Sequence, residues 1–195
     1  RGVALAADGS LCWQDRPTDL RPPVAIDGAH DYLTEIHAQA EAFMATLVDR
    51  LTRGAVLLID YGFGEREYYH PQRSTGTVMC HRAHRADTDP LADAGAKDIT
   101  AHVNFTGIAL AAQQAAAQAG VAGDWHLLGY TSQARFLFNC GLAQMMEQAD
   151  LAQRSMAARL VMEHEMGELF KVIGFCRGAP WQATGFAQGD RSHRL

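Results

Sequence analysis

The sequence predicts an α/β fold, because segments with helical and strand patterns alternate along the chain. Residues from about 31 to 53 have apolar side chains at helical spacing. Directly after Gly54, five consecutive apolar residues, 55–59, have the pattern of a strand covered on both faces. Apolar runs at 125–130 and 169–176 predict further strands. A helix, a glycine and a buried strand in succession are typical of an α/β domain.

Composition narrows the classes of protein and partner. The chain has 195 residues, of which 48% are hydrophobic, and this is enough for one ordinary domain core. Its 22 acidic and 17 basic residues form no long run of either sign, so charge does not indicate a nucleic-acid partner. Four widely spaced cysteines match neither a zinc pattern nor a disulfide framework, and no apolar run approaches the length of a membrane span. Together these features favour a cytoplasmic protein with reduced thiols.

The first part of the chain has a hairpin, a helix with a strand, and a long connection. Residues 1–16 alternate apolar and polar side chains around an Asp-Gly turn, which predicts the hairpin. Residues 31–60 contain the predicted helix and buried strand, and Gly54 occupies the place of a helix C-cap. Residues 61–103 are rich in Gly, Pro, Asp and Arg, with one short strand expected at 77–81. Connections of this length tend to be functional.

The second part of the chain is expected to be mainly helical before its last strand. Asn104 is a suitable N-cap for an alanine-rich helix that ends near residue 119. Residues 132–164 have a helical pattern that is interrupted near Gly141. We expect residues 1–178 to belong to a single domain and the polar residues 179–195 to form a flexible tail.

The first candidate site is the sequence Asp60-Tyr61-Gly62, at the end of the predicted buried strand. Open α/β sheets bind ligands beyond the carboxyl ends of their strands. An alternative of equal weight is structural: Asp60 caps the next turn and Gly62 permits a positive φ. The sequence leaves both interpretations open.

The second candidate is a segment rich in histidine and carboxylate side chains. It supplies enough metal-ligand types for a metal-dependent hydrolase, which would use His81, His84, Asp89 and His102. His81 and His84 are three residues apart in a strand or loop, so their side chains do not converge by spacing alone, and no HExxH motif is present. We therefore predict no metal and favour a polar loop whose arginine and aspartate side chains pair with each other.

The third candidate is the segment Gly129–Gln133, where a strand is expected to run into a helix. Thr131 or Ser132 is a suitable helix N-cap, and this structural interpretation is favoured. The GxSxG motif of a nucleophile elbow is missing, so serine hydrolase chemistry is not predicted.

Five longer segments together carry a resemblance to a known family. They are LLIDYG (57–62), EYYHPQRSTGTVMCHRAHR (67–85), DPLADAGAKDITAHVNF (89–105), GYTSQARFLFNCGL (129–142) and MGELFKVIGF (166–175). In this order they resemble segments of the MidA-like methyltransferases, relatives of the mitochondrial complex I assembly factor that methylates a protein arginine. The resemblance implies a class I fold with S-adenosylmethionine as cofactor, that is, a Rossmann-like mixed sheet with an antiparallel last strand and helical insertions.

The resemblance extends only to the C-terminal half of such enzymes. They carry a glycine-rich strand-turn-helix for the cofactor before this region, and residues 1–54 contain no GxGxxG-like run. The resemblance therefore implies a fragment that is inactive alone, with its cofactor-binding motif outside this chain. The strand at 55–60 would then have an open edge and favour self-association or homo-oligomers. Asn104 stands where the family more often has aspartate, a neutral change for a helix cap.

The resemblance and the chemistry of methyl transfer together suggest residue roles. The acceptor must be held in line with the methyl group beside a carboxylate or imidazole, and an arginine acceptor pairs well with carboxylates. We therefore assign Asp60, Asp98, His102 and Glu168 as catalytic candidates. Those for substrate binding are Tyr61, Gly62, His81, His84, Thr100 and Gln133.

The expected partner is a protein substrate, such as an arginine of a respiratory complex I subunit. A noncatalytic assembly or binding module is the alternative. The composition favours a bacterial cytoplasm, and eukaryotic relatives are mitochondrial by the same resemblance.

Overall fold

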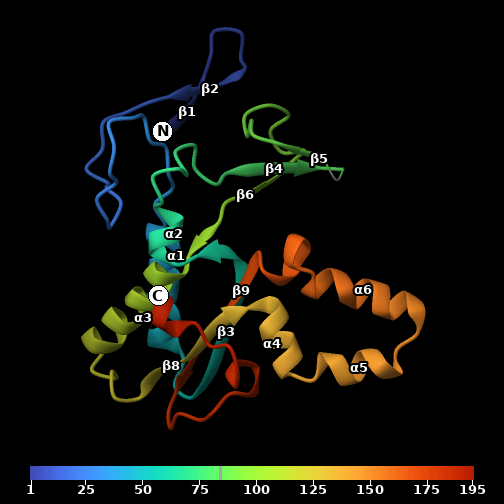
Figure 1. Cartoon of the computed structure of the whole chain (residues 1–195). Coiled ribbons are helices and arrows are strands. Elements are labelled where there is room, and N and C mark those ends of the chain that lie inside the picture. The colour runs from blue at the N-terminus through green and yellow to red at the C-terminus, as the bar shows by residue number, and fades with distance from the viewer. Residues whose placement is uncertain (84) are drawn as a thin grey trace. The chain divides into compact units, whose positions relative to one another are not determined.

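The computed structural model describes residues 1–83 and 85–195, which form two compact units (Figure 1). The first unit combines Arg1–Ile36 with Tyr69–His102, and the second combines His37–Tyr68 with Val103–Leu195. A single domain was expected over residues 1–178, and the structure divides the chain into two compact units. The sequence did not indicate this division, because both units are discontinuous along the chain.

The first unit contains the predicted hairpin. Strands β1 (Gly2–Leu5) and β2 (Leu11–Gln14) pair antiparallel. The turn is held by the Asp8 carboxylate, which accepts hydrogen bonds from both the backbone N–H and the hydroxyl of Ser10. This confirms the prediction made from the Asp-Gly turn.

The long connection of the first unit contains a small antiparallel sheet. Its strands are β4 (Met79–Arg82), β5 (Arg85–Asp87) and β6 (Asp98–Thr100), in the order β5-β4-β6. A single short strand was expected at 77–81, two residues earlier than β4. The preceding turn is held by Glu35, whose carboxylate accepts the N–H groups of residues 77 and 78 and the Thr77 hydroxyl.

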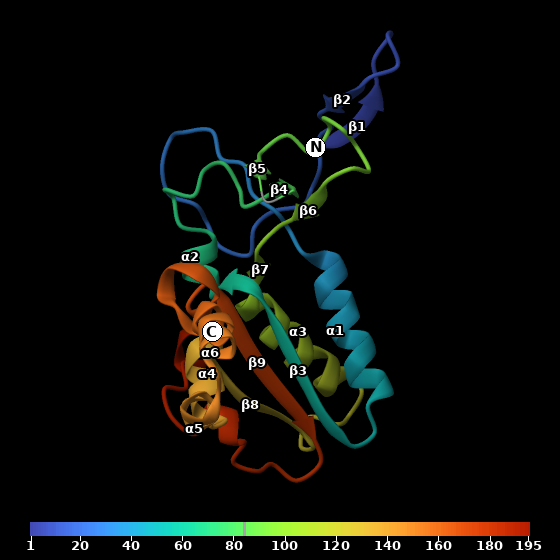
Figure 2. The ribbon, with the colours of Figure 1, turned by 90° about the vertical axis from the view of Figure 1, so that its right-hand side faces the viewer.

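The second unit is built on a mixed four-stranded sheet in the order β7-β3-β9-β8 (Figure 2). These strands are β3 (Gly54–Phe63), β7 (Val103–Asn104), β8 (Trp125–Ser132) and β9 (Phe170–Arg177). β7 pairs parallel with β3, whereas β9 runs antiparallel to both β3 and β8. This confirms the expected antiparallel last strand, and the strand lies beside residues 55–60.

Two helices pack on each other and supply much of the core of the second unit. They are α1 (Ala38–Arg50) and α3 (Phe105–Gln118), and the buried cluster includes Met44, Ile108 and Phe175. The Asn104 side chain accepts the Gly107 N–H at 3.2 Å, as expected for an N-cap. The first helix is shorter than predicted at both ends. Residues 31–36 belong to the first unit, and Gly54 begins β3 instead of capping the helix.

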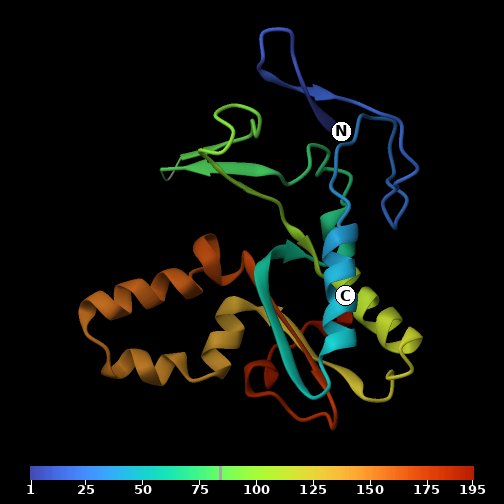
Figure 3. The same cartoon turned by 180° about the vertical axis from the view of Figure 1, so that it is seen from behind.

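The helical region between β8 and β9 has the predicted interruption. It comprises α4 (Gln133–Asn139), α5 (Leu142–Gln148), α6 (Leu151–Val161) and one π-helical turn, Glu163–Gly167. The break falls at Gly141, whose φ of 92° is favourable mainly for glycine. α5 and α6 lie side by side (Figures 1 and 3). No helix in the described ranges is both long and apolar enough to cross a membrane.

The prediction that β3 is covered on both faces is wrong for part of its length. Leu57 and Ile59 are each 50% exposed, while Val56 and Leu58, on the opposite face, pack against the core. One edge of β3 pairs along its length with β9, whereas the other pairs with β7 only at Gly62 and Phe63. Within the described residues, β3 therefore has a half-exposed apolar face and a largely open edge.

The C-terminal segment makes specific contacts with β8, in contrast to the flexible tail expected at residues 179–195. The Asp190 carboxylate accepts the Tyr130 N–H at 2.9 Å, and the Arg191 N–H donates to the Tyr130 carbonyl at 2.6 Å. Phe186 is only 6% exposed. The outer edge of β8 needs hydrogen-bond partners, and this polar segment supplies them.

Candidate functional site

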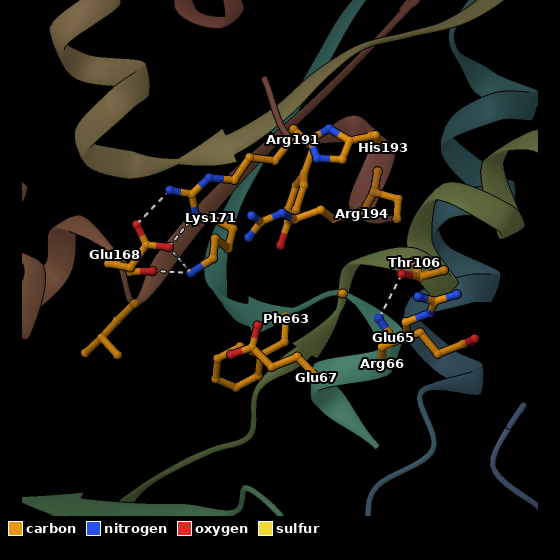
Figure 4. Close-up of a pocket in the computed structure, with 14 residues that line it drawn as sticks. Phe63, Glu65, Arg66, Glu67, Thr106, Glu168, Lys171, Arg191, His193 and Arg194 are labelled. Carbon is orange, nitrogen blue, oxygen red and sulfur yellow. Dashed lines mark hydrogen bonds and ion pairs between the residues drawn. The ribbon is translucent and has the colours of Figure 1, made fainter. Parts of the chain in front are cut away.

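A cavity of about 850 Å³ lies within the second unit, at the carboxyl end of β3 (Figure 4). It is lined by the end of β3, the short helix α2 (Glu65–Tyr68), the start of β9 and the C-terminal segment. Its lining residues are Phe63, Gly64, Glu65, Arg66, Glu67, Thr106, Tyr130, Glu168, Leu169, Lys171, Arg191, His193, Arg194 and Leu195.

Local contacts hold the wall formed by α2. The Glu65 N–H donates to the Thr106 hydroxyl at 2.9 Å, which joins α2 to the start of α3. A Cβ on Gly64 would lie 2.7 Å from the Arg194 carbonyl oxygen, so a glycine here permits close approach of the C-terminal segment. The cavity thus depends on residues that are far apart in the sequence.

Glu168 is the centre of an ionic network on the opposite side. The Arg191 guanidinium binds both of its carboxylate oxygens, at 2.5 and 3.2 Å. The Lys171 ammonium lies 3.5 Å from one of these oxygens and also donates to the Glu168 carbonyl. Two cationic side chains therefore share one carboxylate, and the Lys171 side chain is only 8% exposed.

The environment of this network changes the protonation of its groups. Burial raises the pKa of Glu168, but the Arg191 hydrogen bond and the Lys171 charge lower it more, so the net shift is downward. Burial lowers the pKa of Lys171, and Glu168 only partly offsets that effect. Burial also raises the pKa of Tyr130 far above its ordinary value. At neutral pH the site therefore presents an ionised carboxylate and a neutral phenol.

Glu168→Gln is expected to remove part of the loss of stability in acid. The lowered pKa of Glu168 means that the unfolded chain binds its proton more readily than the folded protein does. Its stabilising contribution is therefore present at neutral pH and is lost as the pH falls below the ordinary value of 4.5.

Urea unfolding of the wild type and the variant measures this effect. The variant should lose more unfolding free energy at about pH 7 than at about pH 3. Glu163→Gln, at an exposed carboxylate without an ion pair in the described part of the chain, is the matched control. An equal difference for Glu168→Gln at both pH values would contradict the role of the ion pair.

Of the predicted site residues in the second unit, only Glu168 lines the cavity. Asp60 is exposed on β3 and accepts the Tyr61 N–H at 2.8 Å, while the Tyr61 ring packs on Phe170 at 4.1 Å between centroids. Gly62 has no positive φ, so the reason predicted for a glycine at this position is wrong. A Cβ on Gly62 would lie 2.2 Å from the Val103 carbonyl oxygen, and the glycine permits close pairing of β3 with β7.

Gln133 has a structural position in α4. It is 8% exposed, and its amide donates to the Leu160 carbonyl at 2.8 Å, which joins α4 to α6. Ser132 makes no side-chain capping hydrogen bond, although it occupies the N-cap position. The Thr131 hydroxyl instead donates to the Gly189 carbonyl at 2.7 Å.

The other predicted site residues belong to the first unit. His81 and Asp98 are exposed and directly opposite each other on β4 and β6, and Thr100 pairs with Met79. The His102 N–H donates to the Thr77 hydroxyl at 3.0 Å. His84 lies outside the described residues. Within residues 1–83 and 85–195, no three histidine, cysteine or acidic side chains gather as metal ligands would.

The sequence analysis missed the α2 residues and the C-terminal arginines of the cavity. A glycine directly after a strand, as at Gly64, is a signal that could have indicated the first of these walls. No comparable pattern marks Arg191 and Arg194. They reach the cavity through the pairing of their segment with β8.

The architecture is that of a mixed α/β domain with a cavity at the end of a strand, the place where open α/β sheets bind ligands. The family model described as "Putative S-adenosyl-L-methionine-dependent methyltransferase" matches residues 2–123, and the chain belongs to this family. Members of the family use S-adenosylmethionine. A comparison with curated proteins gave no match.

Two solved structures from Burkholderia thailandensis are similar to the whole chain. A COG1565 superfamily member bound to S-adenosyl-homocysteine is 44% identical, with a TM-score of 0.89. A native structure of a COG1565 superfamily protein is also 44% identical, with a TM-score of 0.88. Each match covers 100% of this chain but only 51% and 53% of the respective neighbour. The chain therefore spans about half the length of these structures.

The described residues do not by themselves fit a complete S-adenosylmethionine site. A Rossmann-like site needs a glycine-rich turn from a parallel strand into a helix. The glycines at the end of β3 lead into α2, which has only four residues. The only parallel strand pair in the described sheets, β3 with β7, is two residues long.

Proposed function

We propose that this chain forms the acceptor-side part of an S-adenosylmethionine-dependent methyltransferase. The observation that carries the proposal is the likeness in fold, along the whole chain, to a structure bound to S-adenosyl-homocysteine, the product that remains after methyl transfer. As acceptor we propose a protein side chain, such as an arginine of a respiratory complex I subunit. The finer assignment as the C-terminal half of a MidA-like enzyme rests on the five resembling segments.

The proposed acceptor site is the carboxyl end of β3 with its cavity. Glu65 and Glu67 line the cavity from α2, and a guanidinium pairs well with carboxylates. Glu168 is already bound by Arg191 and Lys171, so we propose that it stabilises charge rather than accepts a proton. Asp60 remains the proposed catalytic group of the second unit. In the first unit, taken by itself, His102 remains the proposed one. Tyr61 is the residue of the second unit that we propose to position the acceptor. In the first unit, taken by itself, the residues proposed for acceptor binding are His81, His84, Asp98 and Thr100.

A noncatalytic assembly module is the second candidate function. The two candidates differ in one testable property. In a protein as long as the structural neighbours, only the enzyme transfers a methyl group.

Asp60→Asn and His102→Ala are expected to lower methyl transfer by about 100-fold in a protein as long as the structural neighbours. General acid or base groups contribute roughly this much, and neither substitution should change cofactor affinity more than about twofold. Transfer of radiolabelled methyl groups to purified complex I subunits measures the rate, and calorimetry measures the affinity.

Asp49→Asn is the control, because Asp49 is an exposed carboxylate at the end of α1. It should retain the wild-type rate. Equal losses of rate and cofactor affinity would assign structural roles to Asp60 and His102. Wild-type rates in both variants would remove them from the site.

A further inference from the structure

The walls of the cavity differ in charge. The side formed by β9 and the C-terminal segment carries three cationic side chains, Lys171, Arg191 and Arg194, against the single carboxylate of Glu168. The α2 side carries Glu65 and Glu67 with Arg66 between them. Figure 4 shows Lys171 and Arg191 directed toward Glu168. A ligand in the cavity therefore meets excess positive charge on one side only.

Lys171 is buried and less closely paired with Glu168 than Arg191 is. Its side chain is 8% exposed, and a buried ammonium is costly unless it is well paired. Its carboxylate partner, Glu168, is held more closely by Arg191. The Phe63 ring, 5.8 Å from the ammonium, offers only a weak additional attraction.

The groups around Lys171 do not restore its normal pKa. Burial lowers this pKa, while Glu168 and Glu67 raise it and Arg191 lowers it further, and the net shift remains downward. An anion beside the ammonium would oppose this shift.

Arg194 is a second available cation on the same side. It lines the cavity, and no described residue forms an ion pair or side-chain hydrogen bond with its guanidinium. A cationic ligand group at this wall would add a further positive charge around the one carboxylate. An anionic group would instead be attracted by both Lys171 and Arg194.

We propose that this wall binds a carboxylate of the methyl acceptor, between Lys171 and Arg194. The identification of the ligand as the acceptor rests on the proposed function. Glu65 and Glu67, on the α2 side, bind the arginine that is methylated. The cationic side binds the carboxylate, so the acceptor segment carries an acidic residue close to that arginine. Lys171 and Arg194 are then determinants of specificity for that acidic residue.

Fluorescence anisotropy of labelled peptides tests the proposal, with these 195 residues as part of a protein as long as the structural neighbours. One peptide contains Glu beside Arg, and a matched peptide contains Gln in place of Glu. The Glu peptide should bind about tenfold more tightly, as expected for a charged hydrogen-bonded pair. Lys171→Met and Arg194→Gln should each remove most of this difference.

Arg53→Gln is the matched control for Arg194→Gln, because Arg53 is an exposed arginine just before β3 and does not line the cavity. It should bind both peptides as the wild type does. Arg194 is also exposed, so its substitution tests the site even if Lys171→Met does not fold. Equal binding of the two peptides to the wild type would overturn the proposal.

Inorganic phosphate as competitor distinguishes an acceptor carboxylate from a free anion. Weak competition, at millimolar concentrations, supports a peptide site. Competition by phosphate at concentrations below the peptide Kd would overturn the assignment to the acceptor.

The proposed function is judged separately, by methyl transfer in the longer protein. Transfer to both peptides at equal rates would overturn the carboxylate site but support the proposed methyltransferase. Selective binding of the Glu peptide without any transfer would support the carboxylate site but overturn the proposed methyltransferase.

Discussion

The 195-residue chain alone is expected neither to bind S-adenosylmethionine at micromolar concentrations nor to transfer its methyl group, and it is expected to self-associate. The first expectation follows from the incomplete cofactor site of the described residues. The second follows from β3, whose edge away from β9 pairs with a strand only at Gly62 and Phe63 within the described residues, and whose exposed face carries Leu57 and Ile59. Open apolar strands are sites of association.

Calorimetric titration with S-adenosylmethionine and light scattering of the chain measure these two properties. Leu57→Lys should reduce self-association, because a lysine on an open strand opposes edge pairing. Leu110→Lys is the matched control: Leu110 is 54% exposed on α3, close to the 50% of Leu57. It should leave the association unchanged.

A monomer that binds the cofactor at micromolar concentrations would contradict this prediction. It would place the cofactor site within these 195 residues. Equal effects of Leu57→Lys and Leu110→Lys would instead show that the association does not depend on β3.

Phe186→Ala is expected to lower the free energy of unfolding by about 3–5 kcal/mol, as for other buried phenylalanines. Phe186 is 6% exposed and packs edge-on against Phe136, with 5.2 Å between ring centroids. Its ring fills the space above two glycines of the sheet. A Cβ at Gly129 or Gly174 would lie 2.4 or 2.7 Å from it. Truncation would leave a void that neither glycine can fill.

Urea denaturation of the wild type and the variant measures this loss. Trp181→Ala is the control in the same C-terminal segment, because Trp181 is 51% exposed and its truncation should cost less than about 1 kcal/mol. If both variants retained wild-type stability, the C-terminal segment would not contribute to the core.

Local patterns in the sequence predicted most elements of the second unit. The apolar run after Gly54 identified β3, Asn104 identified the start of α3, and Gly141 marked the break between α4 and α5. Each of these signals depends on neighbouring residues, such as a side chain that accepts the N–H three residues later. Glu168 was assigned through its place in a segment that resembles the methyltransferase family and through its chemistry, and it does line the cavity.

The sequence by itself thus determined where the helices and strands of the sheet unit form, because those choices depend on local backbone and side-chain preferences. Tertiary structure decided the rest of the cavity. Arg191 reaches Glu168 because its segment pairs with β8, through contacts such as the Asp190–Tyr130 hydrogen bond between residues 60 positions apart. Contact with Val103 likewise gives Gly62 a packing role. Such contacts form between residues that are distant in the chain. Their free energy of interaction depends on which residue the fold places opposite, and not on the neighbouring sequence.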